Sequence, residues 1–171
     1  RVAVTGVTAV VIDFNDRMAG ALVPYLSLVV GLSVLLLMLV FRSLLVPIKA
    51  ALGFLLTVGA TFGITTAVFQ QGHLASLVGV DTPGPLISFL PIILVGILFG
   101  LAMDYEVFLV SKMREDYVHG DTPRQATING LGQNARVVTA AAIIMIAVFG
   151  GFVLAHDPII KSIGFALAVG V

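Results

Sequence analysis

The sequence contains four long apolar stretches, and this feature most limits the folds open to the chain. They occupy residues 18–41, 50–69, 86–110 and 137–155, and a fifth apolar stretch begins at 162 and runs to 171. A helix needs about 20 apolar residues to cross a bilayer. Only 11% of the residues are charged, against about 25% in a typical soluble domain. The sequence therefore predicts an all-α integral membrane bundle of four full transmembrane helices plus the start of a fifth.

Composition and motifs argue against several classes of function. The formal net charge is zero, so nothing favours binding to nucleic acid, and the absence of cysteine removes thiolate catalysis and disulfides. No glycine-rich phosphate loop and no His-x-x-x-His pair occurs. The histidines at 73, 119 and 156 lack metal-ligand spacing. We therefore expect a protein that is not an enzyme, with no catalytic residue, no metal and no cofactor.

The segments outside the apolar stretches predict two further elements. Residues 1–14 alternate and are rich in β-branched side chains, which indicates a strand or two leading out of a water-exposed region. Thr122, Pro123 and Gln125 form a helix start, so a short cytoplasmic surface helix is expected over 123–131. The sequence HDPIIK, at 156–161, is expected to be a loop. Neither end of the chain carries a start or stop signal, which indicates a fragment of a longer protein.

The distribution of basic residues orients the predicted helices. Six lie after the first and third spans, and only Arg1, Arg17 and Lys161 lie on the opposite side. By the positive-inside rule, the end with six basic residues is cytoplasmic. These six are Arg42, Lys49, Lys112, Arg114, Arg124 and Arg136.

Glycines in the second and third spans predict close contacts between helices. Gly53, Gly59 and Gly63 lie in the second span, and small residues at such positions let helices approach one another. In the third span, Gly96 and Gly100 lie four residues apart on one helix face. We expect a neighbouring helix to approach that face.

The same face of the third span carries an acid, Asp104, followed by Phe108. A carboxylate inside a membrane span costs roughly 2.5–3.5 kcal/mol on insertion scales, so a function usually accounts for it. Low dielectric raises the pKa of a carboxyl group and a nearby cation or donor lowers it, so Asp104 can take up and release a proton. Tyr105 is a candidate hydrogen-bond donor to an acid on a partner helix. The alternative is that Asp104 only locks two helices together. For Glu106 we expect an ion pair with a basic loop residue.

Several stretches resemble the C-terminal membrane half of the MMPL transporters of the resistance-nodulation-division superfamily. The most specific of them is FLPIILVGILFGLAMDYEVFLVSKMRED, and VFRSLLVPIKAAL and ARVVTAAAIIMIAVFGGF add to it. The resemblance covers nearly the whole chain. It implies that residues 1–17 end an extracytoplasmic porter domain and that residues 18–171 hold spans eight to eleven and the opening of twelve.

In that family an aspartate–tyrosine pair on spans four and ten takes up protons, and Asp104 and Tyr105 match the span-ten pair. Phe108 matches an aromatic neighbour, with Gly96 and Gly100 in support. The resemblance implies these partners: the missing N-terminal half of the same transporter, membrane lipids and a hydrophobic substrate.

The predicted function is a proton-motive-force-driven exporter of lipids or other hydrophobic molecules, multi-pass in the inner cell membrane, with protons as the coupling ion. Two alternatives stay open. One is a sterol- or lipid-sensing membrane module, and the other is a structural membrane scaffold without transport.

Overall fold

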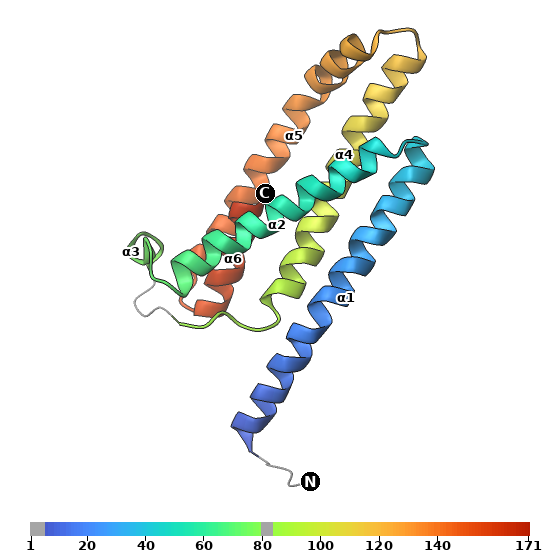
Figure 1. The fold of residues 1–171 in the computed structure, drawn as a ribbon. Helices are drawn as coiled ribbons and strands as arrows, with labels where there is room; N and C mark the ends of the chain where they lie inside the picture. Colours follow the sequence, from blue (N-terminus) through green and yellow to red (C-terminus); the bar gives the residue numbers. More distant parts are fainter. Residues whose placement is uncertain (1–5, 80–83) are drawn as a thin grey trace.

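The computed structural model describes residues 6–79 and 84–171, and every regular element in these two ranges is a helix (Figure 1). Two long helices come first, followed by a single turn of helix, two more long helices and a shorter one. Their bounds are α1 Val7–Phe41, α2 Leu45–Phe69, α3 Ala75–Val78, α4 Leu90–Val118, α5 Pro123–Val153 and α6 Pro158–Gly170.

The four long helices confirm the predicted spans. Each of α1, α2, α4 and α5 is long and apolar enough to cross a membrane, and α6 is a shorter apolar helix of 13 residues. The long helices alternate in direction, so the turns after α1 and α4 lie at one end and those after α2 and α5 at the other (Figure 1). The six basic residues named above therefore gather toward one end of the bundle, as the positive-inside argument requires.

The predicted N-terminal strand is wrong over the part that the structure describes. Val7–Phe41 is one continuous helix, so residues 7–14 are helical, while residues 1–5 lie outside the described residues. Strand propensity is a weak local preference, and an isolated strand has no neighbour to pair with. Extending an existing helix costs less than starting a new element. An exposed ion pair of 3.1 Å between Asp13 and Arg17, one turn apart, supports this extension.

The predicted surface helix over 123–131 is the first part of α5 and not a separate element. Its start is confirmed, because the backbone N–H of Gln125 donates to Thr122 Oγ1 at 3.3 Å. No proline follows in α5 to break it, and Asn134 Nδ2 donates to the carbonyl of Gly130 at 2.9 Å within the same helix. The polar and apolar halves therefore form one helix of 31 residues.

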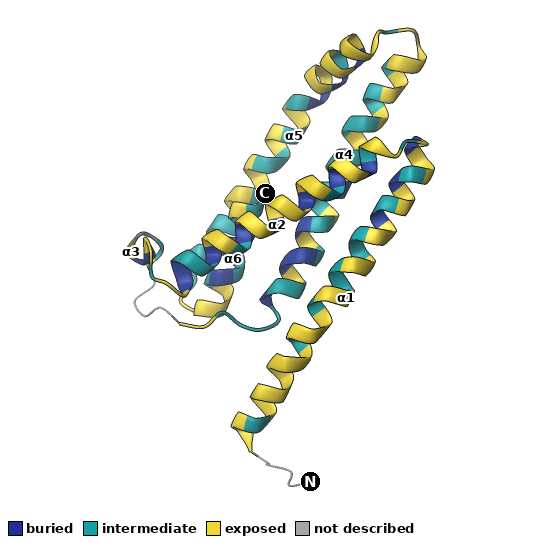
Figure 2. Ribbon diagram, viewed as in Figure 1, coloured by how far each residue is buried: buried dark blue, intermediate teal, exposed yellow. Residues whose placement is uncertain are grey.

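The core lies where α2, α4 and α6 meet, with the inner end of α1 completing it. Leu90, Leu94 and Leu98 recur on one side of α4 and are at most 3% exposed. They pack with buried side chains from the other helices: Leu37, Phe41, Phe54, Val58, Ala166 and Leu167. Figure 2 shows the buried positions facing inward and long exposed runs on α1 and α5. Apolar side chains exposed over such lengths suit contact with lipid or with further membrane helices.

The close helix contacts predicted at the glycines of the second span do not occur among the described helices. A Cβ built on Gly53, Gly59 or Gly63 meets nothing within 4 Å, so no helix among the described residues makes the predicted close contact there. At Gly130, by contrast, a Cβ would lie 2.7 Å from Met113 Cγ, between α4 and α5. At Gly164 it would lie 2.5 Å from Phe152 Cβ, between α5 and α6. The tightest packing is thus between neighbouring helices of the α4–α5–α6 unit.

Asp157 caps α6, which explains why the predicted loop at 156–161 is mostly helix. Its Oδ1 accepts hydrogen bonds from the backbone N–H groups of Ile159 at 2.7 Å and Ile160 at 3.3 Å. Pro158 occupies the first helical position, where a missing N–H costs nothing.

Removing this cap is expected to destabilise the start of α6. Asp157→Ala in the full-length protein should lower the free energy of unfolding by about 1 kcal/mol, because two backbone donors lose their acceptor. Thermal unfolding in detergent measures the effect. Asp157→Asn should retain most of the stability, and Asp13→Ala, which removes only an exposed ion pair, should change little. Equal midpoints for Asp157→Ala and Asp13→Ala would show that the cap contributes nothing.

Candidate functional site

Asp104 lies in α4 on a face that no described helix covers. Its side chain is exposed within the described chain, as are Gly100, one turn earlier, and Phe108, one turn later, which is 47% exposed. A Cβ on Gly100 would meet nothing within 4 Å. The expected approach of a neighbouring helix is therefore absent at Gly100 among the described residues.

At Gly96 the expected approach does occur. A Cβ built there would lie 2.8 Å from the hydroxyl oxygen of Tyr25 in α1, so the lack of a side chain makes room for this phenol. Between this contact and the basic end of the bundle, α1 and α4 enclose an apolar groove of about 270 Å³, which Phe99, Met103 and Val107 line from the α4 side. Helical geometry places Asp104 about 100° around α4 from Met103, beyond the edge of that groove.

The other sides of α4 are occupied. Phe99 meets Phe54 of α2 edge to face, with ring centroids 5.2 Å apart, and Met113 lies against Gly130 of α5. With α1, α2 and α5 placed in this way, the side that carries Asp104 is the open one. The acid therefore faces away from every helix described.

The two neighbours of Asp104 in the sequence take different positions. Tyr105 and Glu106 are both half-buried, and neither makes a side-chain hydrogen bond with Asp104 in the described structure. The predicted ion pair of Glu106 with a basic loop residue is wrong, because no Lys, Arg or His nitrogen of the described residues lies within 4.0 Å of its carboxylate. Lys112, one and a half turns further along, pairs instead with Glu115 at 3.1 Å and Asp116 at 3.6 Å.

Two long-range hydrogen bonds attach α4 to α1, one at each end of the apolar region. At the basic end, the Arg114 guanidinium donates to the carbonyl of Val40 in the last turn of α1. At the opposite end, the Ser88 hydroxyl, just before α4, donates to the side-chain carbonyl of Asn15. Sequence reasoning did not find either contact, since partners more than 70 residues apart leave no local pattern. The helix that bears Asp104 is thus joined to α1 above and below the groove.

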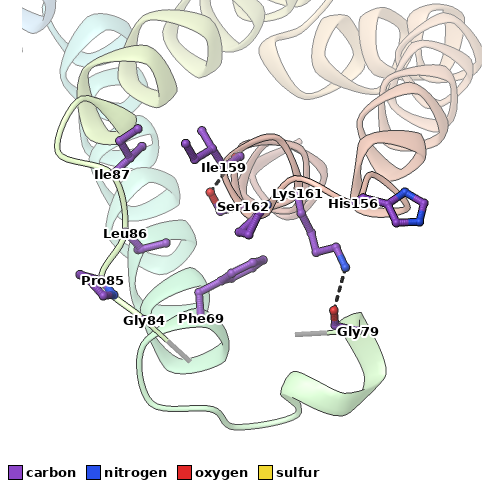
Figure 3. Close-up of a pocket in the computed structure, with 11 residues that line it drawn as sticks. Phe69, Gly79, Gly84, Pro85, Leu86, Ile87, His156, Ile159, Lys161 and Ser162 are labelled. Atoms are coloured by element: carbon purple, nitrogen blue, oxygen red, sulfur yellow. Dashed lines mark hydrogen bonds between the residues drawn. The ribbon is translucent and has the colours of Figure 1, made fainter. Parts of the chain in front are cut away.

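A second cavity, of about 370 Å³, lies at the end opposite the basic residues, between the end of α2, the segment before α4 and the start of α6 (Figure 3). Phe69, Leu86 and Ile159 contribute apolar walls. Lys161 Nζ donates to the carbonyl of Gly79 at 2.7 Å across its rim. None of the predicted site residues lines it, so it is separate from the Asp104 face.

Chemically, α4 places two acids, Asp104 and Glu106, in the apolar stretch over 86–110. Within residues 6–79 and 84–171, no group of three or more His, Asp or Glu side chains is placed to hold a metal ion. In membrane proteins, acids inside the spans almost always face a protein interior or a water-filled cavity.

Four helices able to span a bilayer, together with an acid inside one of them, define a segment of a multi-pass membrane protein. The chain belongs to the MMPL family, whose family model matches residues 1–171.

Its relatives include membrane protein YdfJ of Bacillus subtilis, 52% identical over 98% of this chain and 23% of that protein. The mycolic acid-containing lipids exporter MmpL11 of Mycolicibacterium smegmatis is 38% identical over 98% of this chain and 18% of its own length. The probable trehalose monomycolate exporter MmpL3 of Mycobacterium leprae is 39% identical over 79% of this chain and 14% of its own length. The chain therefore spans less than a quarter of the length of these three relatives.

Proposed function

We propose that this chain is part of a proton-motive-force-driven exporter of lipids or other hydrophobic molecules, and that Asp104 forms one half of its proton relay. The observation that carries the proposal is the position of Asp104, in an apolar span and on a face that no described helix covers. The chain lies in the inner cell membrane as a multi-pass segment, with its basic end toward the cytoplasm.

The energetics favour a protein partner for Asp104. A carboxylate facing hydrocarbon costs roughly 2.5–3.5 kcal/mol, whereas one that faces other polar groups or water avoids much of that cost. Relatives several times longer than this chain have ample further sequence to supply the facing helix. Tyr105, about 100° away on α4, then donates a hydrogen bond to an acid on that facing helix.

The contacts between α4 and α1 suggest how a proton is coupled to transport. Protonation of Asp104 removes a charge and changes which partners its face attracts, so α4 shifts. The Arg114–Val40 and Ser88–Asn15 hydrogen bonds pass that shift to α1. At 1.5 Å per residue α1 is about 52 Å long, longer than the hydrocarbon core is thick, so it carries motion out of the membrane.

The relatives support a hydrophobic substrate. Two of them are named as exporters of mycolic acid-containing lipids and of trehalose monomycolate.

The test uses the full-length protein in liposomes that contain a fluorescent lipid. An imposed proton gradient should drive the lipid across the membrane, and a protonophore should stop it. A lipid sensor would bind the lipid equally with and without the protonophore and would move none. A scaffold would neither bind nor move it, and either result would refute the exporter proposal.

A further inference from the structure

Four basic side chains from α4, α5 and the α1–α2 region lie toward the end of the bundle that carries the α1–α2 and α4–α5 turns. We call Arg42, Lys49, Arg114 and Arg136 the basic rim. All four are exposed. None has a carboxylate within 4.0 Å among the described residues. The positive charges of the rim are thus not neutralised by ion pairs within the described part of the chain.

The nearby acids are already engaged. Glu115 and Asp116 both pair with Lys112, which is not part of the rim. Asp121 Oδ2 accepts a hydrogen bond of 2.9 Å from Asn129. Six basic residues and these three acids lie at this end, so it keeps an excess of positive charge.

The rim lies at the level where the apolar helices leave the membrane. Arg114 donates to Val40, so its guanidinium is level with the last turn of α1, and Arg42 follows that turn directly. Lys49 lies in the first turns of α2.

Arg136 starts deeper in the bundle but can reach the same level. It lies six residues beyond Gly130, which contacts Met113, and α5 runs back into the membrane, so its Cα is about 9 Å deeper. Long arginine side chains at such positions extend along the helix toward the phosphate layer. All four cations can therefore lie in the headgroup region together.

We propose that the basic rim binds the phosphate groups of anionic phospholipids in the surrounding leaflet. Lys and Arg side chains next to membrane helices are attracted by the negative surface charge of such lipids. Guanidinium groups also bind phosphate oxygens through paired N–H donors. The contact holds the α1–α2 turn and α5 at a fixed depth. The proposed binding of lipid phosphates does not depend on the proposed proton relay.

The experiment measures lipid retention by the purified full-length protein in nanodiscs of equal parts phosphatidylglycerol and phosphatidylcholine. The wild type should retain phosphatidylglycerol over phosphatidylcholine by at least about fivefold. The triple variant Arg42→Gln, Lys49→Gln, Arg136→Gln should bring the ratio close to one. Arg114 stays unchanged because it also holds α1. The control Arg124→Gln removes an exposed cation from the α4–α5 turn, outside the rim, and should leave the ratio at the wild-type value.

Two further measurements keep the proposal testable if the triple variant does not fold. The double variant Arg42→Lys, Arg136→Lys preserves charge and should preserve the preference. Raising the salt concentration should reduce the preference of the wild type, because exposed charges are screened. Equal retention of both lipids by the wild type, a preference that survives in the triple variant, or a preference indifferent to salt would each overturn the proposal.

Discussion

Replacing Asp104 with asparagine in the full-length protein is expected to abolish proton-driven export while the folded yield stays near that of the wild type. Asparagine has nearly the same shape as aspartate and keeps hydrogen-bonding capacity, but its amide does not take up and release a proton at physiological pH. Asp104 is exposed within the described chain and takes no part in its core, so folding of this segment does not depend on its charge. Export into vesicles and the monodisperse peak in size-exclusion chromatography measure the two quantities.

Companion substitutions separate the proton-binding role from a helix lock. Asp104→Ala should also lose export and retain yield. Tyr105→Phe removes only a hydroxyl and should weaken export without abolishing it. Glu106→Gln, on another side of α4, should export at close to the wild-type rate. If Asp104→Asn exports normally, Asp104 carries no proton, and if both Asp104 variants fail to accumulate, the helix-lock interpretation gains.

The second large effect is expected at Gly164, where α6 packs against α5. A Cβ there would lie 2.5 Å from Phe152 Cβ and 2.8 Å from the carbonyl oxygen of Phe149. Backbone atoms cannot move aside as a flexible side chain can, so Gly164→Leu should cost about 3 kcal/mol and sharply reduce the folded yield. Thermal unfolding of the purified protein gives the size of the loss.

Gly151 provides the matched control, since it lies in the last turn of α5 and a Cβ there meets nothing within 4 Å. Gly151→Leu should keep a yield near that of the wild type. If the two leucine variants are equally stable, α5 and α6 do not pack as closely as the structure shows.

The number and order of the membrane helices could be predicted from the sequence, because a bilayer imposes a minimum length of apolar residues. The ends of the helices could not. Hydropathy marks where a helix leaves the membrane, but α4 runs on to Val118 and α1 starts at Val7 because a helix continues in water when nothing breaks it. For the same reason the polar start of α5 was mistaken for a separate helix.

The candidate site, too, could be predicted from the sequence only in part. The periodicity of α4 grouped Gly96, Gly100, Asp104 and Phe108 on one face, since 3.6 residues per turn fix their directions. The last three are exposed in the structure, whereas Gly96 lies against Tyr25 of α1. It did not predict which glycines other helices approach, because that depends on how pairs of helices pack together. Gly164 stood in an apolar run with no distinguishing pattern, and its neighbours Phe149 and Phe152 come from another helix.

The central claim is that Asp104 takes up a proton from one side of the membrane during transport. It is tested most directly by proton flux through the full-length protein in liposomes that enclose a pH-sensitive dye. In the presence of transported lipid and a pH gradient, the wild type should move protons down the gradient and Asp104→Asn should show only the leak of empty liposomes. Equal proton flux through both proteins would contradict the account.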